Sequence, residues 1–255
     1  MKILPKNWHI TLASFVIFLS IWSILTYGGF VELFFLPSPT DVVSATVTLF
    51  TEYDLVSDIL VSVYRVFAGF LLAAIVGVPL GILIGTHKKI KAFLEPLIGV
   101  SRYLPIAAFI PLCILWFGIG DLEKIIFLFI AIFPFLTLMI ADVSANVQRE
   151  LIEIAYTLGA KRKTILTKVI IPASLPGIFD NLRLCAAIGW TYIVIAEIVA
   201  ASSGLGHIVI QSQRFLQTAN IMSCIVIIAL LGLFTDYIFR ISRDYLLPWA
   251  KVEVA

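Results

Sequence analysis

The strongest constraint on this chain is a series of apolar blocks, each long enough to cross a lipid bilayer. Of its 255 residues, 61% are hydrophobic and only 13% are charged, whereas soluble domains have about 45–50% apolar and about 25% charged residues. Each crossing requires about 20 mainly apolar residues. Six such blocks occupy residues 10–27, 64–85, 96–117, 122–140, 182–201 and 221–239. We therefore predict an all-α membrane protein whose single domain, residues 1–255, contains six transmembrane helices.

Lysine and arginine are concentrated in every second connector between these blocks. The basic connectors contain Lys2, Lys6, Lys88, Lys89, Lys91, Arg149, Lys161, Arg162, Lys163, Lys168, Arg240, Arg243 and Lys251. By contrast, residues 28–63 contain no lysine or arginine, and the short turn near Asp121 contains only Lys124. Because basic connectors tend to stay in the cytoplasm, we expect a multi-pass protein with both termini in the cytoplasm.

Two local patterns predict further structure. The second block carries small residues at intervals of four, namely Gly69, Ala73, Gly77, Gly81 and Gly85. Such a row lets another helix approach closely, and we favour packing within the chain over a dimer contact. In residues 36–41, two prolines followed by Thr40 and Asp41 predict the start of a short surface helix.

The longest polar segment, residues 143–181, falls in the predicted cytoplasmic set. Apolar residues give one side of a short helix, Gly159 interrupts it, and a second short helix is expected after the break. Pro172 and Pro176 are then expected to interrupt the helix before the fifth block. An amphipathic helix held at the membrane by anionic lipid has a similar composition, so composition alone leaves that alternative open.

The order of residues in this segment resembles the EAA signature of ABC importer permeases. That signature is Glu-Ala-Ala, three residues, Gly, nine residues and Ile-x-Leu-Pro. This chain has Glu153-Ile154-Ala155, Gly159 and Val169-Ile170-Ile171-Pro172 at the same spacing, with apolar replacements only. The resemblance implies that residues 143–181 form a coupling segment for a separate ATPase. The residues it assigns to coupling are Glu153, Ala155, Gly159, Ala160, Lys161, Arg162 and Pro172.

Other segments resemble the nitrate/sulfonate/taurine (bicarbonate) group of these permeases. They are Leu36-Pro37-Ser38-Pro39, Arg102-Tyr103-Leu104-Pro105, residues 115–120, Ala196-Glu197 and Gly204-Leu205-Gly206. The resemblance covers nearly the whole chain. It implies the type I importer permease fold, a five-helix core plus one N-terminal helix, in the bacterial inner membrane. It also implies import of a small anion such as nitrate, bicarbonate, a sulfonate or taurine, with a pyrimidine-type precursor as an open alternative.

The energy for transport is expected to come from another polypeptide. The chain lacks a GxxxxGK[ST] phosphate loop, since residues 85–88 lack the second glycine. We therefore expect ATP and Mg²⁺ on a partner ATPase, and no catalytic residue, cofactor or metal in this chain. Six helices make a thin wall for a solute path, so a second permease copy, as a homodimer, is expected. The resemblance also implies a periplasmic or lipid-anchored substrate-binding protein; membrane lipid is a further partner, and nucleic acid is not.

Four charged residues lie within or at the edge of the apolar blocks, where charges usually face a cavity or a partner. Arg102 and Glu197 are candidates for the solute pathway, and a structural pair between them is the alternative. Arg65 and Arg183 are interpreted as anchors that reach the membrane surface. Residues 202–206, with Gly204 and Gly206, form either a flexible gate loop or a simple turn.

Two other classes of function compete with the importer. A polytopic membrane enzyme needs clustered His, Asp, Cys or Ser, but the histidines are scattered. Cys113, Cys185 and Cys224 are also far apart, inside apolar blocks, and are best explained as packing residues. An ion-coupled transporter working alone should show repeat symmetry or paired buried carboxylates, and the blocks contain few acids. The importer permease is therefore favoured.

Overall fold

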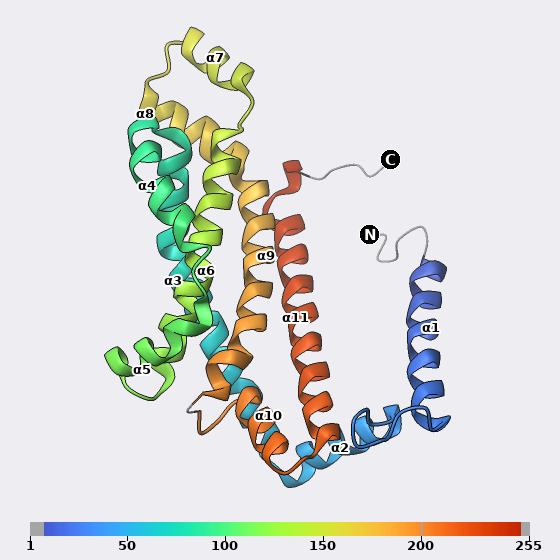
Figure 1. Cartoon of the computed structure of the whole chain (residues 1–255). Coiled ribbons are helices and arrows are strands. Elements are labelled where there is room, and N and C mark those ends of the chain that lie inside the picture. Colours follow the sequence, from blue (N-terminus) through green and yellow to red (C-terminus); the bar gives the residue numbers. More distant parts are fainter. Residues whose placement is uncertain (1–7, 200, 251–255) are drawn as a thin grey trace.

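The computed structural model describes residues 8–199 and 201–250, and every regular element in these ranges is helical (Figure 1). The elements are α1 Trp8–Tyr27, α2 Pro39–Glu52, α3 Leu55–Thr86, α4 Lys88–Ser101, η1 Ile106–Phe109, α5 Ile110–Phe117, α6 Asp121–Ala145, α7 Arg149–Thr157, α8 Arg162–Ile165, the π-helical turn η2 Leu166–Ile170, α9 Ile171–Ile198, α10 Leu205–Arg214, α11 Thr218–Leu246 and η3 Pro248–Ala250.

Five helical segments in the described ranges are long and apolar enough to cross a membrane. They are α1, α3, α6, α11 and the continuous run Arg162–Ile198. A sixth is added if α4 and residues 106–117, which meet at 89°, are taken as one span. Lys2, Lys6 and Lys251, which the orientation argument used, lie outside the described residues, as does residue 200 of the predicted block 182–201.

The block predicted as the third span, residues 96–117, does not form one helix. α4 ends at Ser101, and the chain resumes helical structure only after Pro105. Proline has no N–H to donate, and it disfavours helical backbone in the residue before it, here Leu104. The helix therefore breaks at residues 102–105, and α5 leaves the bundle at a steep angle (Figure 1).

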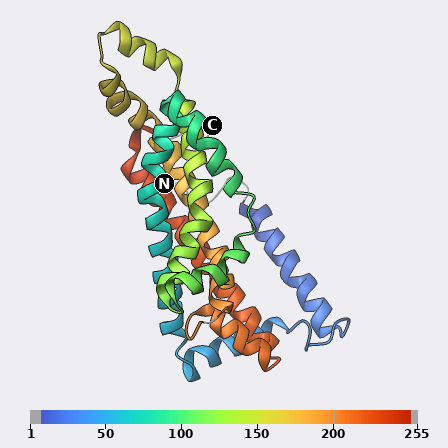
Figure 2. The same cartoon turned by 60° about the vertical axis from the view of Figure 1, so that its left-hand side comes forward.

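α3 and α6 lie side by side and form the centre of the bundle (Figures 1 and 2). A Cβ added to Gly81 would lie 2.6 Å from the carbonyl oxygen of Thr137, and one added to Gly69 would lie 2.6 Å from Cβ of Leu128. The row of small residues thus lets the two backbones approach closely, which confirms the prediction of packing within the chain. α9 and α11 complete the bundle.

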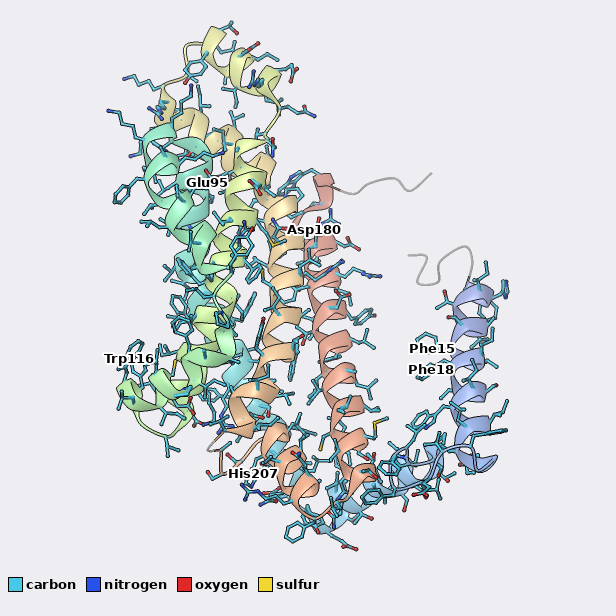
Figure 3. The ribbon with its side chains drawn as sticks, viewed as in Figure 1. Phe15, Phe18, Glu95, Trp116, Asp180 and His207 are labelled. Carbon is cyan, nitrogen blue, oxygen red and sulfur yellow. The ribbon has the colours of Figure 1, made fainter. Side chains whose placement is uncertain are left out.

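α1 stands apart from the rest of the bundle and is connected to it through α2. In Figure 3, Phe15 and Phe18 project from α1 toward α11 without reaching it, and both side chains are exposed. α2 begins at a capping box, in which the N–H of Asp41 donates to Oγ of Ser38 (3.2 Å) and the N–H of Ser38 donates to the Asp41 carboxylate (3.1 Å). This confirms the predicted short helix.

Candidate functional site

Within the predicted coupling segment, residues 143–181, two short helices, α7 and α8, project beyond the ends of α3 and α6 (Figure 1). Ala155 faces inward and is buried, whereas Glu153 on the same helix is exposed. Lys161 and Arg162, at the start of α8, are exposed as well. We call this end of the bundle the α7 end, and the opposite end, with α2, α5 and α10, the α10 end.

Gly159 ends α7 with a backbone conformation that favours glycine. Its φ is +76°. Its N–H donates to the carbonyl oxygen of Tyr156 (2.9 Å), and the N–H of Ala160 donates to that of Ala155 (3.0 Å). This pair of bonds is a Schellman motif, which satisfies the last carbonyl groups of a helix and turns the chain sharply. Three residues that the resemblance assigned to coupling, at positions 155, 159 and 160, therefore build one turn.

Pro172 has an equally local effect at the start of α9. It lacks the N–H that would bond to the carbonyl of residue 168 in an α-helix. The preceding turn, η2, is instead π-helical, and the N–H of Ile171 donates to the carbonyl oxygen of Leu166. Such wider turns inside helices are often found at functional sites. Here the turn connects α8 to the long helix α9.

α7 also presents apolar side chains that nothing in the described residues covers. Leu158 is 81% exposed and Ile154 is 56% exposed, while Leu151 and Tyr156 are exposed beside them. Because α7 lies beyond the ends of the bundle helices (Figure 1), these side chains form a small apolar surface on an otherwise polar helix. A surface of this kind is suited to contact with another protein or with membrane lipid.

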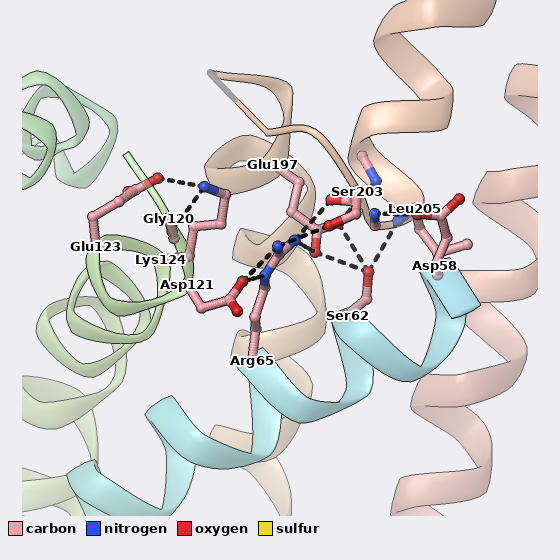
Figure 4. A network of polar contacts seen from close by, with 12 residues as sticks. Asp58, Ser62, Arg65, Gly120, Asp121, Glu123, Lys124, Glu197, Ser203 and Leu205 are labelled. Atoms are coloured by element: carbon pink, nitrogen blue, oxygen red, sulfur yellow. Dashed lines mark hydrogen bonds and ion pairs between the residues drawn. The ribbon is translucent and has the colours of Figure 1, made fainter. Parts of the chain in front are cut away.

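At the α10 end, a buried polar network is centred on Glu197, in the last turn of α9 (Figure 4). Its carboxylate is fully buried. One oxygen accepts a hydrogen bond from Arg65 on α3 (2.8 Å), and the other accepts one from the N–H of Gly206 (2.9 Å). The hydroxyl of Ser62, also on α3, lies 2.9 Å from both oxygens. Three donors, from Arg65, Ser62 and Gly206, thus surround the buried carboxylate.

Arg65 connects this carboxylate to two other parts of the chain (Figure 4). Its Nε donates to Asp121 at the start of α6 (2.7 Å), and its Nη1 donates to the carbonyl oxygen of Ser203 (2.8 Å). The residue is only 3% exposed. A guanidinium group has five donors in a rigid fork, which suits it to hold α3, α6, the end of α9 and the following loop together.

The loop of residues 202–206 is held tightly by this network rather than free. The N–H of Gly204 donates to Asp58 (2.5 Å), and the N–H of Leu205 donates to Ser62 (2.9 Å). Gly204 has a φ of +106°, and a Cβ added to Gly206 would lie 2.6 Å from Cβ of Glu197. Both glycines are needed because the loop passes directly over the Glu197 side chain.

Two interpretations of charged residues need correction. Arg65 was interpreted as a membrane-surface anchor, but it is the buried centre of the network, because two carboxylates lie within its reach. Arg183, interpreted as the other anchor, forms an ion pair with Asp236 on α11 (2.9 Å), and its anchoring role stays a prediction. Arg102 does not pair with Glu197: it is exposed at the end of α4, without a hydrogen-bond or ion-pair partner for its guanidinium in residues 8–199 and 201–250.

Sequence reasoning also missed a second buried pair. Lys124 was placed in a short turn outside the membrane, yet it lies in the first turn of α6 and is buried together with Glu123. Its Nζ donates to Glu123 (2.5 Å) and to the carbonyl oxygen of Gly120 (3.0 Å). The signal that was available is the cluster of Asp121, Glu123 and Lys124 at the start of the fourth apolar block, since charges there need partners when they are buried.

Comparison with known proteins identifies the class to which this fold and these sites belong. Residues 77–252 match the family described as binding-protein-dependent transport system inner membrane component. The match covers more than half of the chain, so the chain belongs to this family of ABC importer permeases, which are multi-pass proteins of the inner membrane. The predicted family is therefore confirmed.

Individual relatives agree with this assignment. A probable ABC transporter permease protein of Brucella abortus is 37% identical over 244 residues, which make up 95% of this chain and 96% of the relative. A putative aliphatic sulfonates transport permease protein, SsuC, of Bacillus subtilis is 34% identical over 235 residues, or 91% of this chain and 84% of the relative. Both relatives are named as permeases, which fits a transport subunit.

The fold has a counterpart of known structure. A chain from the MetNI methionine ABC transporter superposes with a TM-score of 0.67 and 21% identity, over 78% of this chain and 96% of that chain. The likeness confirms the predicted all-α, type I importer permease fold.

Proposed function

We propose that this chain forms the translocation pathway of an ATP-driven importer, and that it receives its driving force through α7 and α8. The observation that carries the proposal is the uncovered apolar surface of α7, at Leu158, Ile154 and Leu151. A helix that projects beyond the bundle and exposes such side chains is suited to enter a cleft in another protein. The partner would be a separate ATPase that carries ATP and Mg²⁺.

The charge distribution supports the orientation that this role requires. Lys88, Lys89, Arg149 and Arg162 belong to elements at the α7 end. The α10 end carries acidic residues in α2 and at the start of α3. By the rule that basic connectors remain inside, the α7 end faces the cytoplasm, where an ATPase would bind. The start of α1 and the end of α11 are the ends of these helices that lie toward α7 (Figure 1).

The polar network is the second structural element of the proposed transport mechanism. It closes the α10 end by tying α3, α6 and α9 to the loop of residues 202–206. In alternating access, the outer end of the path must open toward a substrate-loaded binding protein. We propose that Arg65, Glu197 and the loop separate at that step. Two copies of the chain, as a homodimer, would enclose the path.

The substrate class that we propose is a small organic sulfonate. The support is the Bacillus subtilis relative named for aliphatic sulfonates, which is 34% identical over 91% of this chain. Nitrate, bicarbonate and a pyrimidine-type precursor are the alternatives. Binding of each compound to the cognate binding protein, measured by calorimetry, distinguishes them: a sulfonate should bind and the others should not.

The coupling role is tested by placing a charge on the apolar surface of α7. Leu158→Asp should abolish retention of the ATPase subunit during co-purification, because an ionised carboxylate cannot be buried in an apolar contact. Phe215→Asp is the matched control, since Phe215 is also highly exposed but lies in the α10–α11 connection. If Leu158→Asp retains the ATPase as well as Phe215→Asp does, α7 is not the docking element.

A further inference from the structure

The helix α4 has three distinct sides along its length. One side packs into the core cluster shared with α3 and α6, at Ile90, Leu94 and Ile98. A second side is apolar and 62–70% exposed, at Phe93, Leu97 and Val100. The polar side lies between these two and carries Lys91, Glu95, Gly99 and Arg102. Intervals of four, four and three residues place these four positions on one flank of a helix. Since lipid offers no hydrogen-bond partner to polar groups, the polar side needs water or protein beside it.

The polar side extends from the α7 end deep into the membrane. Arg102 caps α4 with helical dihedral angles, φ −66° and ψ −24°, so the helical rise extends to it. It follows Lys91, the last lysine of the basic connector, by eleven residues, or about 16 Å along the helix axis. The hydrocarbon core of a bilayer is about 30 Å thick. Figure 2 shows that α4 ends between the α7 end and the α10 end. Arg102 therefore lies near the middle of the membrane.

The charges on the polar side are compensated except at Arg102. Lys91 forms an ion pair with Glu95 (3.7 Å). The guanidinium of Arg102 is exposed and has no partner within residues 8–199 and 201–250. A charge at that depth is costly in lipid, and such charges face a cavity or a water-filled path instead. The polar side therefore combines one available cation with a surface that lipid does not suit.

We propose that the polar side of α4 lines the aqueous path, and that Arg102 there binds the anionic head group of the substrate, a sulfonate. The inference rests on the proposed importer function and identifies the residue in the path that meets the charge of the substrate. The planar fork of a guanidinium binds two oxygens of such a group at once. Gly99 leaves room one turn nearer the α7 end, because a Cβ added there meets no atom within 4 Å.

Accessibility to water is tested by the rate at which thiol reagents modify Gly99→Cys in the assembled transporter in bilayer nanodiscs. Two methanethiosulfonate reagents are compared, one carrying a sulfonate and one carrying a trimethylammonium group. The native cysteines are free and buried, so the background should be low. Leu97→Cys, on the apolar side of the same helix, is the matched control. It should react at least about tenfold more slowly, because the reactive thiolate forms in water and not in lipid.

The role of Arg102 is tested by the preference of the new thiol for the anionic reagent. Positions 99 and 102 are neighbours on the helix surface, so Arg102→Gln should lower the ratio of the anionic to the cationic rate about tenfold. Lys89→Gln removes the same charge from an exposed position on α4. It lies about 15 Å along the helix from position 99, beyond the screening length of about 10 Å, and should change the ratio less than about twofold. Methanesulfonate should slow the anionic reagent, whereas uncharged methanesulfonamide should not.

Two results would overturn the proposal. One is that Gly99→Cys reacts no faster than Leu97→Cys, as expected where lipid or the second copy covers the polar side. The other is that Lys89→Gln lowers the rate ratio as much as Arg102→Gln does. If Gly99→Cys does not assemble, Arg102→Cys takes its place, and its failure to react faster than Leu97→Cys is equally decisive. ATPase retention is scored separately, so failure of the path assignment and failure of the docking role are distinct results.

Discussion

Arg65→Gln is the most informative single substitution, because it removes the centre of the polar network. The change leaves Glu197, whose side chain is fully buried, without its cation. Breaking one partner of a buried ion pair costs about 3–5 kcal/mol. The contact with Asp121 adds only about 0–1 kcal/mol, since that carboxylate is 51% exposed. For a chain of this length, such a loss lowers the midpoint of thermal unfolding by about 10 °C.

The assay can use the protein's own thiols. Cys113, Cys185 and Cys224 are free and buried, so a thiol-reactive fluorescent dye reports unfolding of the purified permease in detergent. Arg102→Gln is the matched control: it removes the same charge from an exposed position, and it should change stability by less than about 0.5 kcal/mol.

A double variant tests the pairing itself. In Arg65→Gln with Glu197→Gln, the second substitution removes the uncompensated charge, so the combined loss should be smaller than the sum of the single losses by about 1–3 kcal/mol. The reasoning is refuted if Arg65→Gln is as mild as Arg102→Gln. It is equally refuted if the two losses simply add.

Two glycine substitutions test the backbone geometry. In Gly159→Ala the added Cβ meets no atom within 4 Å, so the cost comes from the left-handed backbone alone, about 1–2 kcal/mol. Stimulated ATPase activity should fall while the complex stays assembled. Gly118→Ala is the control, because Gly118 has a φ of +77° and equal space but lies at the other end of the bundle, and this variant should keep that activity. Gly206→Ala should destabilise the permease by about 1–3 kcal/mol through contact with Glu197, whereas Gly99→Ala, in open space on α4, should raise its melting temperature slightly.

The coupling segment was the part of the candidate site that its sequence described best, because its geometry is local. Gly159 and Ala160 form a turn with residues only three to five positions earlier. Pro172 alters the turn directly before it. Contacts between residues so close in sequence require particular residue types at fixed spacings, and a pattern of that kind can be recognised in one sequence.

The polar network could not be predicted in the same way. Arg65 is separated from Asp121 by 56 positions and from Glu197 by 132. Composition shows that an unpaired charge in an apolar block costs free energy, but it does not show which charged residues pair with each other. The sequence suggested Arg102 as the possible partner of Glu197, and only the packing of α3 beside α6 and α9 identifies Arg65 as the actual one. The helix break at Pro105 was missed for a similar reason. Hydropathy shows that an apolar block is long enough to cross the membrane, but it does not show whether the helix bends within the block.

The two candidate sites are joined by the same pair of helices. α6 begins at Asp121, in the network, and runs toward the coupling segment; α9 leaves that segment and ends beside Glu197. With 25 and 28 residues and a rise of 1.5 Å per residue, the helices are about 37 Å and 42 Å long. A partner that moves α7 and α8 thus acts on two helices that reach the network without an intervening loop. Arg65 on α3 bonds to Asp121 on α6 and to Glu197 on α9. A relative shift between α6 and α9 must therefore strain these bonds. The proposed docking element and the polar network therefore lie at opposite ends of the same two helices.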